Sequence, residues 1–284
     1  MKTPILIECP RDAMQGIKNW IPTEAKIKYI QSLLSVGFDV LDVGSFVSPK
    51  AIPQMKDTAV VLENIDFSEC KSELLVIVAN LRGALEAVKY DAITYIGFPL
   101  SVSENFQMRN THKTQDEALF LLDQLIEVCN NSGKRLVVYL SMGFGNPYGD
   151  PWSVEIVTNW IDLLAQKGIQ IISLSDTVGS AKTNDISEIF KAAINQYSEI
   201  EIGAHFHTQP EKAFSKIKAA HEAGCNRFDG AIKGFGGCPM AADNLTGNMP
   251  SEKLISYFNQ QQIPLNIDPI KFEYAYNQSL NIFI

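Results

Sequence analysis

Two histidines separated by one residue, His205 and His207, form the most informative pattern in the chain. They end a mostly apolar run, 201–207, which has the composition of a buried β-strand. Side chains two apart on a strand point to the same side, so both imidazoles can face one point while Phe206 turns away. The pattern allows a hydrogen-bonded histidine pair or a metal site, and we favour the metal site.

Oxygen donors follow two other expected strands. Asp12 comes just after the first strand and Asn248 comes after the eighth. In a closed barrel these strands adjoin the seventh, so both side chains should lie near the histidine pair. Two nitrogens and two oxygens, with no thiolate, suit an octahedral divalent cation with positions left for substrate or water. We therefore expect Mg²⁺ or Mn²⁺, although two imidazoles also tolerate zinc or cobalt.

Arg11 and Cys238 are the other candidates for chemistry. Arg11 can form an ion pair with a strand-end carboxylate, Asp42 or Asp176, or hold an oxygen on which negative charge develops, and the two roles are compatible. Cys238 lies in the glycine-rich run 234–239. This run is either an ordinary turn or a loop that brings a catalytic thiol close to a ligand.

Eight short apolar runs, most of them followed by an amphipathic helical stretch, must position these side chains. The alternation predicts a single (β/α)₈ TIM barrel over residues 1–284, with two closing helices after Gly247 and its chemistry at the carboxyl ends of the strands. A doubly wound open sheet is the alternative, but no GxGxxG follows a strand, which weakens its dinucleotide-binding form. The expected strands are 5–9, 39–45, 74–79, 92–97, 135–141, 169–175, 201–207 and 226–232.

Local signals predict where several helices begin. Thr23 is the expected N-cap of one helix, and Asp150 opens another. Thr114 and Glu117 have the spacing of a capping box. The polar stretch 98–113 is expected to be a long loop.

Composition excludes several classes of protein. The 284 residues are 46% hydrophobic and carry a net charge of −8, which argues against a nucleic-acid partner. No apolar run reaches the roughly 18 residues of a membrane span, and no secretory signal is evident. The five cysteines are widely spaced without a CxxC pair, which disfavours disulfides and zinc ribbons. We expect a cytoplasmic protein.

Longer stretches make a family resemblance apparent. CPRDAMQGIKNWIPTEAKI and GSFVSPKAIPQM resemble the N-terminal signature of 3-hydroxy-3-methylglutaryl-CoA (HMG-CoA) lyases. GFGGCP followed by TGN is similar to their active-site loop, HFH to their paired histidines, and SLSDTVG to their sixth strand. The resemblance runs nearly end to end. The wider superfamily of barrel lyases and Claisen-type synthases shares the Arg-Asp and His-x-His motifs but generally not GGCP.

The resemblance implies a metal-dependent lyase that cleaves an acyl-CoA substrate, HMG-CoA, to acetoacetate and acetyl-CoA, as in leucine degradation. It implies that Arg11 stabilises the enolate, that Cys238 takes part in proton transfer, and that Lys18 has a less direct role. The proton acceptor would be Asp12 or a histidine. A homo-oligomer is also expected. The implied metal ligands are Asp12, His205, His207 and Asn248.

Three departures from the family pattern put the substrate in question. Asp42 stands where the family usually has Glu, which shortens the reach by about 1.3–1.5 Å. Thr208 follows the histidine pair where Asp is common, and one additional residue separates Cys238 from Asn248. The alternatives are a related acyl-CoA lyase, a Claisen-type synthase, or a non-catalytic barrel that binds acyl-CoA and metal.

Overall fold

The computed structural model describes residues 3–237 and 246–283, and its eight strands close into one parallel barrel. Each strand pairs with the next, and β8 pairs with β1 to complete the circle. The (β/α)₈ TIM-barrel prediction is therefore confirmed. The strands are β1 (Ile5–Glu8), β2 (Val40–Ser45), β3 (Glu73–Ile77), β4 (Ile93–Ser101), β5 (Arg135–Ser141), β6 (Ile171–Asp176), β7 (Glu201–Phe206) and β8 (Arg227–Gly230).

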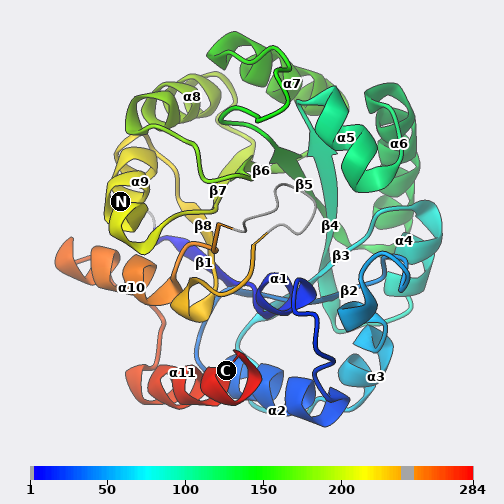
Figure 1. Cartoon of the computed structure of the whole chain (residues 1–284), viewed down its shortest axis with the longest axis vertical. Coiled ribbons are helices and arrows are strands. Elements are labelled where there is room, and N and C mark those ends of the chain that lie inside the picture. The colour runs from blue at the N-terminus through cyan, green and yellow to red at the C-terminus, as the bar shows by residue number, and fades with distance from the viewer. Residues whose placement is uncertain (1–2, 238–245, 284) are drawn as a thin grey trace.

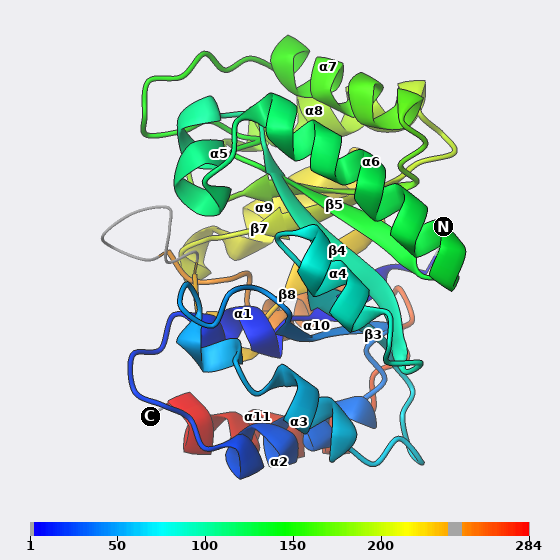
Figure 2. The same cartoon turned by 90° about the vertical axis from the view of Figure 1, so that its right-hand side faces the viewer.

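Helices surround the barrel, as Figure 1 shows from one end and Figure 2 from the side. Among the described residues, no helix is both long and apolar enough to cross a membrane. The α-helices are α1 (Pro10–Gln15), α2 (Thr23–Leu34), α3 (Thr58–Glu63), α4 (Leu81–Ala87), α5 (Glu104–Thr111), α6 (Gln115–Ser132), α7 (Val154–Gln166), α8 (Thr183–Gln196), α9 (Ala213–Glu222), α10 (Ser251–Gln260) and α11 (Pro269–Phe283). Short 3₁₀ helices are η1 (Pro53–Met55), η2 (Pro210–Lys212) and η3 (Ile232–Gly234).

The alternation of side chains along each strand divides the core into two layers. Leu6 of β1 packs outward against the helices, whereas Ile7 belongs to an inner cluster with Leu75 and Val137. Phe206 likewise faces outward and contacts Phe144, with the ring centroids 5.4 Å apart. Because the strands are buried on both faces, they read as nearly continuous apolar runs.

The two closing helices, α10 and α11, are present as predicted. The last helix, α11, packs beside α2 (Figures 1 and 2). The N–H of Asp268 donates to the carbonyl of Val36 at 2.8 Å. Gly37 permits this approach, because a Cβ there would lie 2.0 Å from the carbonyl oxygen of Asn266, and its φ is +104°.

Three local predictions were wrong. The stretch 98–113 is not a loop, because β4 continues to Ser101 and α5 begins after the N-cap Ser103. Thr23 does not cap α2, since its hydroxyl donates to Asp57 instead. Asp150 does not open α7, because it accepts hydrogen bonds from α5 and its N-cap while Ser153 caps α7. The capping box at the start of α6 is confirmed.

Hydrogen bonds to Glu8 connect β1 to the segment that contains Asn248. This fully buried carboxyl accepts hydrogen bonds from the N–H of Ile232, at 2.9 Å, and from the hydroxyl of Ser251. Burial raises the pKa of Glu8 from its ordinary value of 4.5 to about 8, against the opposing effect of these hydrogen bonds. Residues 232 and 251 are thereby held to the same strand end.

Replacing Glu8 with Gln should remove a pH dependence of stability. The folded chain holds the Glu8 proton more tightly than the unfolded chain, so the contribution is complete below about pH 4.5 and is lost as the pH rises through about 8. The unfolding free energy of the wild type should therefore fall relative to that of Glu8→Gln between pH 5 and 9, by at most about 1.4 kcal/mol per pH unit. Denaturant unfolding at several pH values measures this, and parallel pH profiles would contradict it.

Candidate active site

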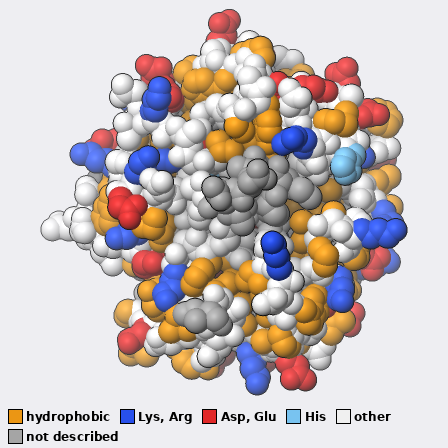
Figure 3. Space-filling view, in the orientation of Figure 1, with side chains coloured by type: hydrophobic (Ala, Val, Ile, Leu, Met, Phe, Trp, Pro, Cys, Tyr) orange, Lys and Arg blue, Asp and Glu red, His pale blue; other side chains and the backbone are white. Residues whose placement is uncertain are grey.

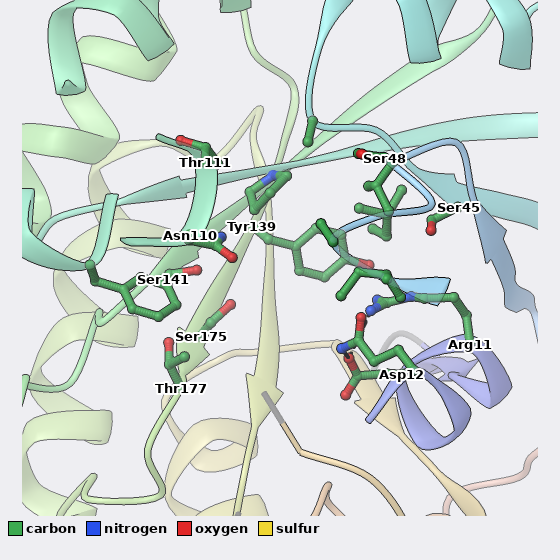
Figure 4. Close-up of a pocket in the computed structure, with 18 of the residues that line it drawn as sticks. Arg11, Asp12, Ser45, Ser48, Asn110, Thr111, Tyr139, Ser141, Ser175 and Thr177 are labelled. Atoms are coloured by element: carbon green, nitrogen blue, oxygen red, sulfur yellow. Dashed lines mark hydrogen bonds and ion pairs between the residues drawn. The ribbon is translucent and has the colours of Figure 1, made fainter. Parts of the chain in front are cut away.

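A pocket of about 260 Å³ opens at the carboxyl ends of the strands (Figure 4). Arg11 and Asp12 enter it from α1, and the ring of Tyr139 lies in its middle. Asn110 and Thr111, at the end of α5, line the opposite side. Both members of the histidine pair also line the pocket, so it brings together residues from distant parts of the chain.

Arg11 is held between two carboxylates. Its Nε and Nη2 donate to Oδ2 of Asp42 at 3.0 and 2.5 Å, and its Nη1 donates to Oδ1 of Asp12 at 2.8 Å. Arg11 is 7% exposed. The sequence left two candidates for the carboxylate partner of Arg11, Asp42 and Asp176. The structure shows that Asp42 is the partner. Although Asp42 is shorter than the usual Glu, it still contacts Arg11 through two nitrogens.

This arrangement determines the charge on each group. Burial works to raise the pKa of Asp12, but Arg11 and the two histidines outweigh it and hold the pKa at about 2. Burial raises the pKa of Asp42 to about 6 although Arg11 opposes it. Burial also acts to lower the pKa of Arg11, but Asp42 and Asp12 raise it above its ordinary value. Asp12 is therefore ionised beside a permanent cation.

The two histidines lie side by side as predicted. Their ring centroids are 5.3 Å apart, with the rings at 82°. Nδ1 of His205 is 2.9 Å from Oδ2 of Asp229 on β8, a residue that the sequence analysis missed. A carboxylate at one ring nitrogen orients the other nitrogen of a ligating histidine. The sequence signal for Asp229 was its position, since a charged residue inside a buried strand needs a partner.

The two imidazoles differ in basicity. Burial acts to lower the pKa of His205, but its hydrogen bond to Asp229 and the charge of that carboxylate raise it overall. Burial and the neighbouring His205 lower the pKa of His207 to about 4. His207 is therefore neutral at neutral pH, as a ligand must be.

Asn248 reaches the same place by a short bridge to His207. Its Nδ2 donates to the carbonyl of Phe235 at 2.8 Å, which leaves its carbonyl oxygen as the available donor to a cation. Gly236, with φ of +92°, approaches both Asp12 and Asn248. A Cβ there would lie 2.5 Å from the backbone oxygen of Asp12 and 2.9 Å from Nδ2 of Asn248. Glycine is thus required at position 236. Cys238 lies outside the described residues.

The donor set fits a divalent cation. Asp12, His205 and His207 each offer one ligand atom, and these atoms lie within 4.8 Å of one another. Oδ1 of Asp12 accepts from Arg11 and Gln15, whereas Oδ2 is buried without a partner among the described residues. Nδ1 of His207 is also buried and unpartnered there. Such buried polar atoms are rare unless a ligand satisfies them.

Two supporting residues lie outside the ligand set. Asp176 contacts the buried Lys216, whose Nζ is 2.5 Å from Oδ2 of Asp176 and donates to the carbonyls of Gly179 and His207, each at 3.1 Å. Lys216 therefore positions the backbone at His207, a contact that no local motif predicts. Lys18 is exposed and does not line the pocket.

Several residues that line the pocket were not predicted from the sequence. Tyr139 packs edge-on against His205 with the centroids 5.4 Å apart, and Gly97 gives its ring room, since a Cβ there would lie 2.9 Å from it. His112 and Lys113 line the pocket just after α5. The polar stretch 98–113 after a strand end was the signal, but it was interpreted only as a loop.

The surface around the pocket carries charges of both signs. Figure 3 shows acidic and basic side chains spread around the rim of the face seen in Figure 1. Among the described residues of this face no broad basic patch is apparent, which agrees with the net charge of −8.

Comparison with known proteins identifies similar chains. A family model described as HMGL-like matches residues 5–277. The chain is 32% identical to the hydroxymethylglutaryl-CoA lyase of Bacillus subtilis over 91% of this chain and 85% of that protein. It is 30% identical to the 3-hydroxy-3-isohexenylglutaryl-CoA/hydroxy-methylglutaryl-CoA lyase of Pseudomonas aeruginosa, again over 91% and 85%.

Solved structures agree in fold. The Bacillus subtilis HMG-CoA lyase superposes with a TM-score of 0.92 at 30% identity, covering 100% of this chain and 94% of that one. An HMG-CoA lyase from Acinetobacter baumannii, solved in complex with coenzyme A and 3-methylmalate, has a TM-score of 0.91 at 28% identity, covering 99% and 91%.

Replacing Lys216 with Met should strongly destabilise the protein. Removal of one partner of a buried ion pair leaves an uncompensated charge, here on Asp176, at a cost of about 3–5 kcal/mol. The double variant Lys216→Met/Asp176→Asn should recover part of the loss. Lys218→Met is the matched control on the same helix, because its 3.8 Å pair with Glu222 is exposed. Denaturant unfolding measures all three, and equal effects at both lysines would refute the assignment.

Proposed function

We propose that this chain, which belongs to the HMGL-like family and is an HMG-CoA lyase-like enzyme, cleaves HMG-CoA to acetoacetate and acetyl-CoA with the help of a divalent cation. The supporting observation is that an ionised carboxylate, two imidazoles and a buried arginine meet in one pocket. The reaction fits the leucine degradation that the resemblance implies. We further propose that the chain acts as one catalytic domain.

The cation would be held by Oδ2 of Asp12, the two imidazoles and the carbonyl oxygen of Asn248. These donors suit an octahedral site for Mg²⁺ or Mn²⁺ better than they suit a closed tetrahedral site for zinc. When bound, a divalent cation supplies Lewis-acid polarisation of the oxygens of the substrate. Asp229 would keep His205 oriented by retaining its proton on Nδ1.

Residues of the chain would carry out proton transfer and stabilise the enolate. The proton of the tertiary hydroxyl passes to Asp12 or to a histidine of the pair. The C2–C3 bond then breaks, its electron pair forms the enolate of acetyl-CoA, and C3 becomes the ketone of acetoacetate. Arg11, which keeps its charge at every working pH, stabilises the enolate oxygen. We assign delivery of a proton to the enolate carbon to Cys238, with Asp42 holding Arg11 in place.

Several features support an acyl-CoA substrate. A similar lyase was solved with coenzyme A bound, and Lys113 at the pocket mouth can meet an anionic group. Val47, Ile52 and Ile77 provide an apolar wall for the 3-substituent. Because a relative is named for an isohexenyl substrate as well, the size of this substituent distinguishes the candidate substrates.

Location and assembly are also part of the proposal. Cys9, Cys70, Cys129 and Cys225 are free thiols, which supports a reducing cytoplasm. We expect a homo-oligomer from the family resemblance.

Removal of divalent cations should abolish the proposed reaction. Protein treated with a chelator should release no acetoacetate from HMG-CoA, and added Mg²⁺ or Mn²⁺ should restore release. Parallel assays with the isohexenyl analogue, and with acetyl-CoA plus a 2-oxo acid, separate the related lyase and the synthase. Failure to cleave HMG-CoA with any divalent cation would exclude that substrate.

Arg11→Gln should lower kcat by at least about 10²-fold, because it removes a charge that is needed most when the enolate forms. Binding of Mn²⁺, followed by electron paramagnetic resonance, should persist because Arg11 is not a ligand. The control Arg82→Gln alters an exposed arginine on α4 and should leave kcat unchanged. Turnover of Arg11→Gln near the wild-type rate would remove its assigned role.

A further inference from the structure

A second group of candidate donor atoms shares His205 with the first. Cys9, His205 and Asp229 each offer one ligand atom, and these atoms lie within 4.8 Å of one another. Cys9 follows β1 and belongs to the inner cluster of the barrel, where its side chain is buried and its thiol is free. This group shares only His205 with the ligand set described above.

Two buried oxygens near this group lack partners. Oδ2 of Asp229 contacts Nδ1 of His205, but Oδ1 has no hydrogen-bond partner among the described residues, although Asp229 is only 3% exposed. The hydroxyl of Tyr139, 6% exposed, is also unpartnered there. Tyr139 belongs to the same inner cluster as Cys9, and its ring packs edge-on against His205. A buried carboxylate oxygen without a partner, beside a thiol, is a donor that a cation can use.

We propose that Cys9, His205 and Asp229 form a binding site for a soft divalent cation such as Zn²⁺. Sulfur, imidazole nitrogen and carboxylate oxygen are the donors that zinc takes in tetrahedral sites, and Tyr139 or a water completes four. Binding releases the thiol proton of Cys9 and the proton on Nδ1 of His205 to solvent, while the sulfur and nitrogen lone pairs bind the cation. No oxidant or reductant is required.

The charges around Cys9 favour a cation over a bare thiolate. Burial raises the pKa of the Cys9 thiol, and the carboxylates of Asp229, Asp42 and Asp12 raise it further. Of the charged groups that act on Cys9, three are these carboxylates and one is the guanidinium of Arg11, so carboxylates predominate around the thiol. The lone thiol is thus unreactive by itself but is suited to share a dication with Asp229.

Occupation of this site would alter the first one. His205 keeps its orientation through the 2.9 Å contact between Nδ1 and Asp229, and a cation on Nδ1 replaces that contact. The soft cation would therefore weaken binding of Mg²⁺ or Mn²⁺ at Asp12 and His207. Only this consequence rests on the proposed function; binding of the soft cation does not.

The test is a Cd²⁺ titration of the reduced, metal-free protein, followed by thiolate-to-cadmium charge-transfer absorption. We expect a component that saturates at one equivalent in the wild type and is lost in Cys9→Ser. Cys225→Ser is the matched control, because Cys225 is also buried and free but bonds backbone carbonyls of Ile202 and Arg227. An equal band in Cys9→Ser shows that another thiol binds, and this result overturns the proposal, as does the absence of a band in the wild type.

Further measurements keep the test independent of folding and of catalysis. Asp229→Asn retains the thiol and should weaken Cd²⁺ binding at least tenfold; unchanged binding would exclude this ligand set. X-ray absorption of the Zn²⁺-loaded protein should show one sulfur at about 2.3 Å. Zn²⁺ should displace Mn²⁺ from the wild type at lower concentration than from Cys9→Ser, in which only direct competition at the first site remains. If the protein does not cleave HMG-CoA but shows the one-equivalent band, the proposed function fails and the soft-cation site stands. If the protein cleaves HMG-CoA but shows no band, the proposed function stands and the soft-cation site is refuted.

Discussion

The buried guanidinium of Arg11, shared between Asp42 and Asp12, is the interaction on which the site depends. A cation removed from water needs compensating carboxylates, and here they come from two elements, β2 and α1. Two carboxylates around one arginine leave a local charge of −1 when both are ionised. Because Arg11 occupies Oδ1 of Asp12, Oδ2 stays available as a donor within the group that Asp12 forms with His205 and His207. The same ion pair thus positions a base, a cation and a ligand oxygen.

Contacts outside the pocket hold the ligand-bearing loops in register with this ion pair. Lys216 bonds the carbonyl of His207, and the N–H of Thr208 donates to Gly247 at 2.8 Å. Glu8 holds the chain on both sides of Asn248. These contacts are made by groups other than the donor atoms, so they hold the donors together independently of the cation. Preorganisation of this kind reduces the free energy that binding must supply to order the ligands.

Periodicity and strand-end position predicted the barrel and the meeting of Asp12 with the histidine pair, because both follow from local pattern and topology. Local propensity failed where a tertiary partner decided the outcome. Asp150 has the type of an N-cap but bonds α5 instead, and the helix over Glu104–Thr111 is too polar to show an apolar face. Asp229 and Lys216 could not be assigned roles from sequence, since their partners are 24 and 40 residues away along the chain.

His205 illustrates why residue type alone does not determine the role of a side chain. His205 belongs to two groups of candidate donors, one with Asp12 and His207 and one with Cys9 and Asp229, and its Nδ1 contacts Asp229. Hard cations favour the first set and soft cations the second. Because a neutral imidazole has one lone pair and one N–H, it serves one side as ligand only while it donates to the other. With the proton on Nδ1, held against Asp229, His205 would serve the oxygen-rich site, so in the proposed arrangement Asp229 would govern which cation the pocket takes.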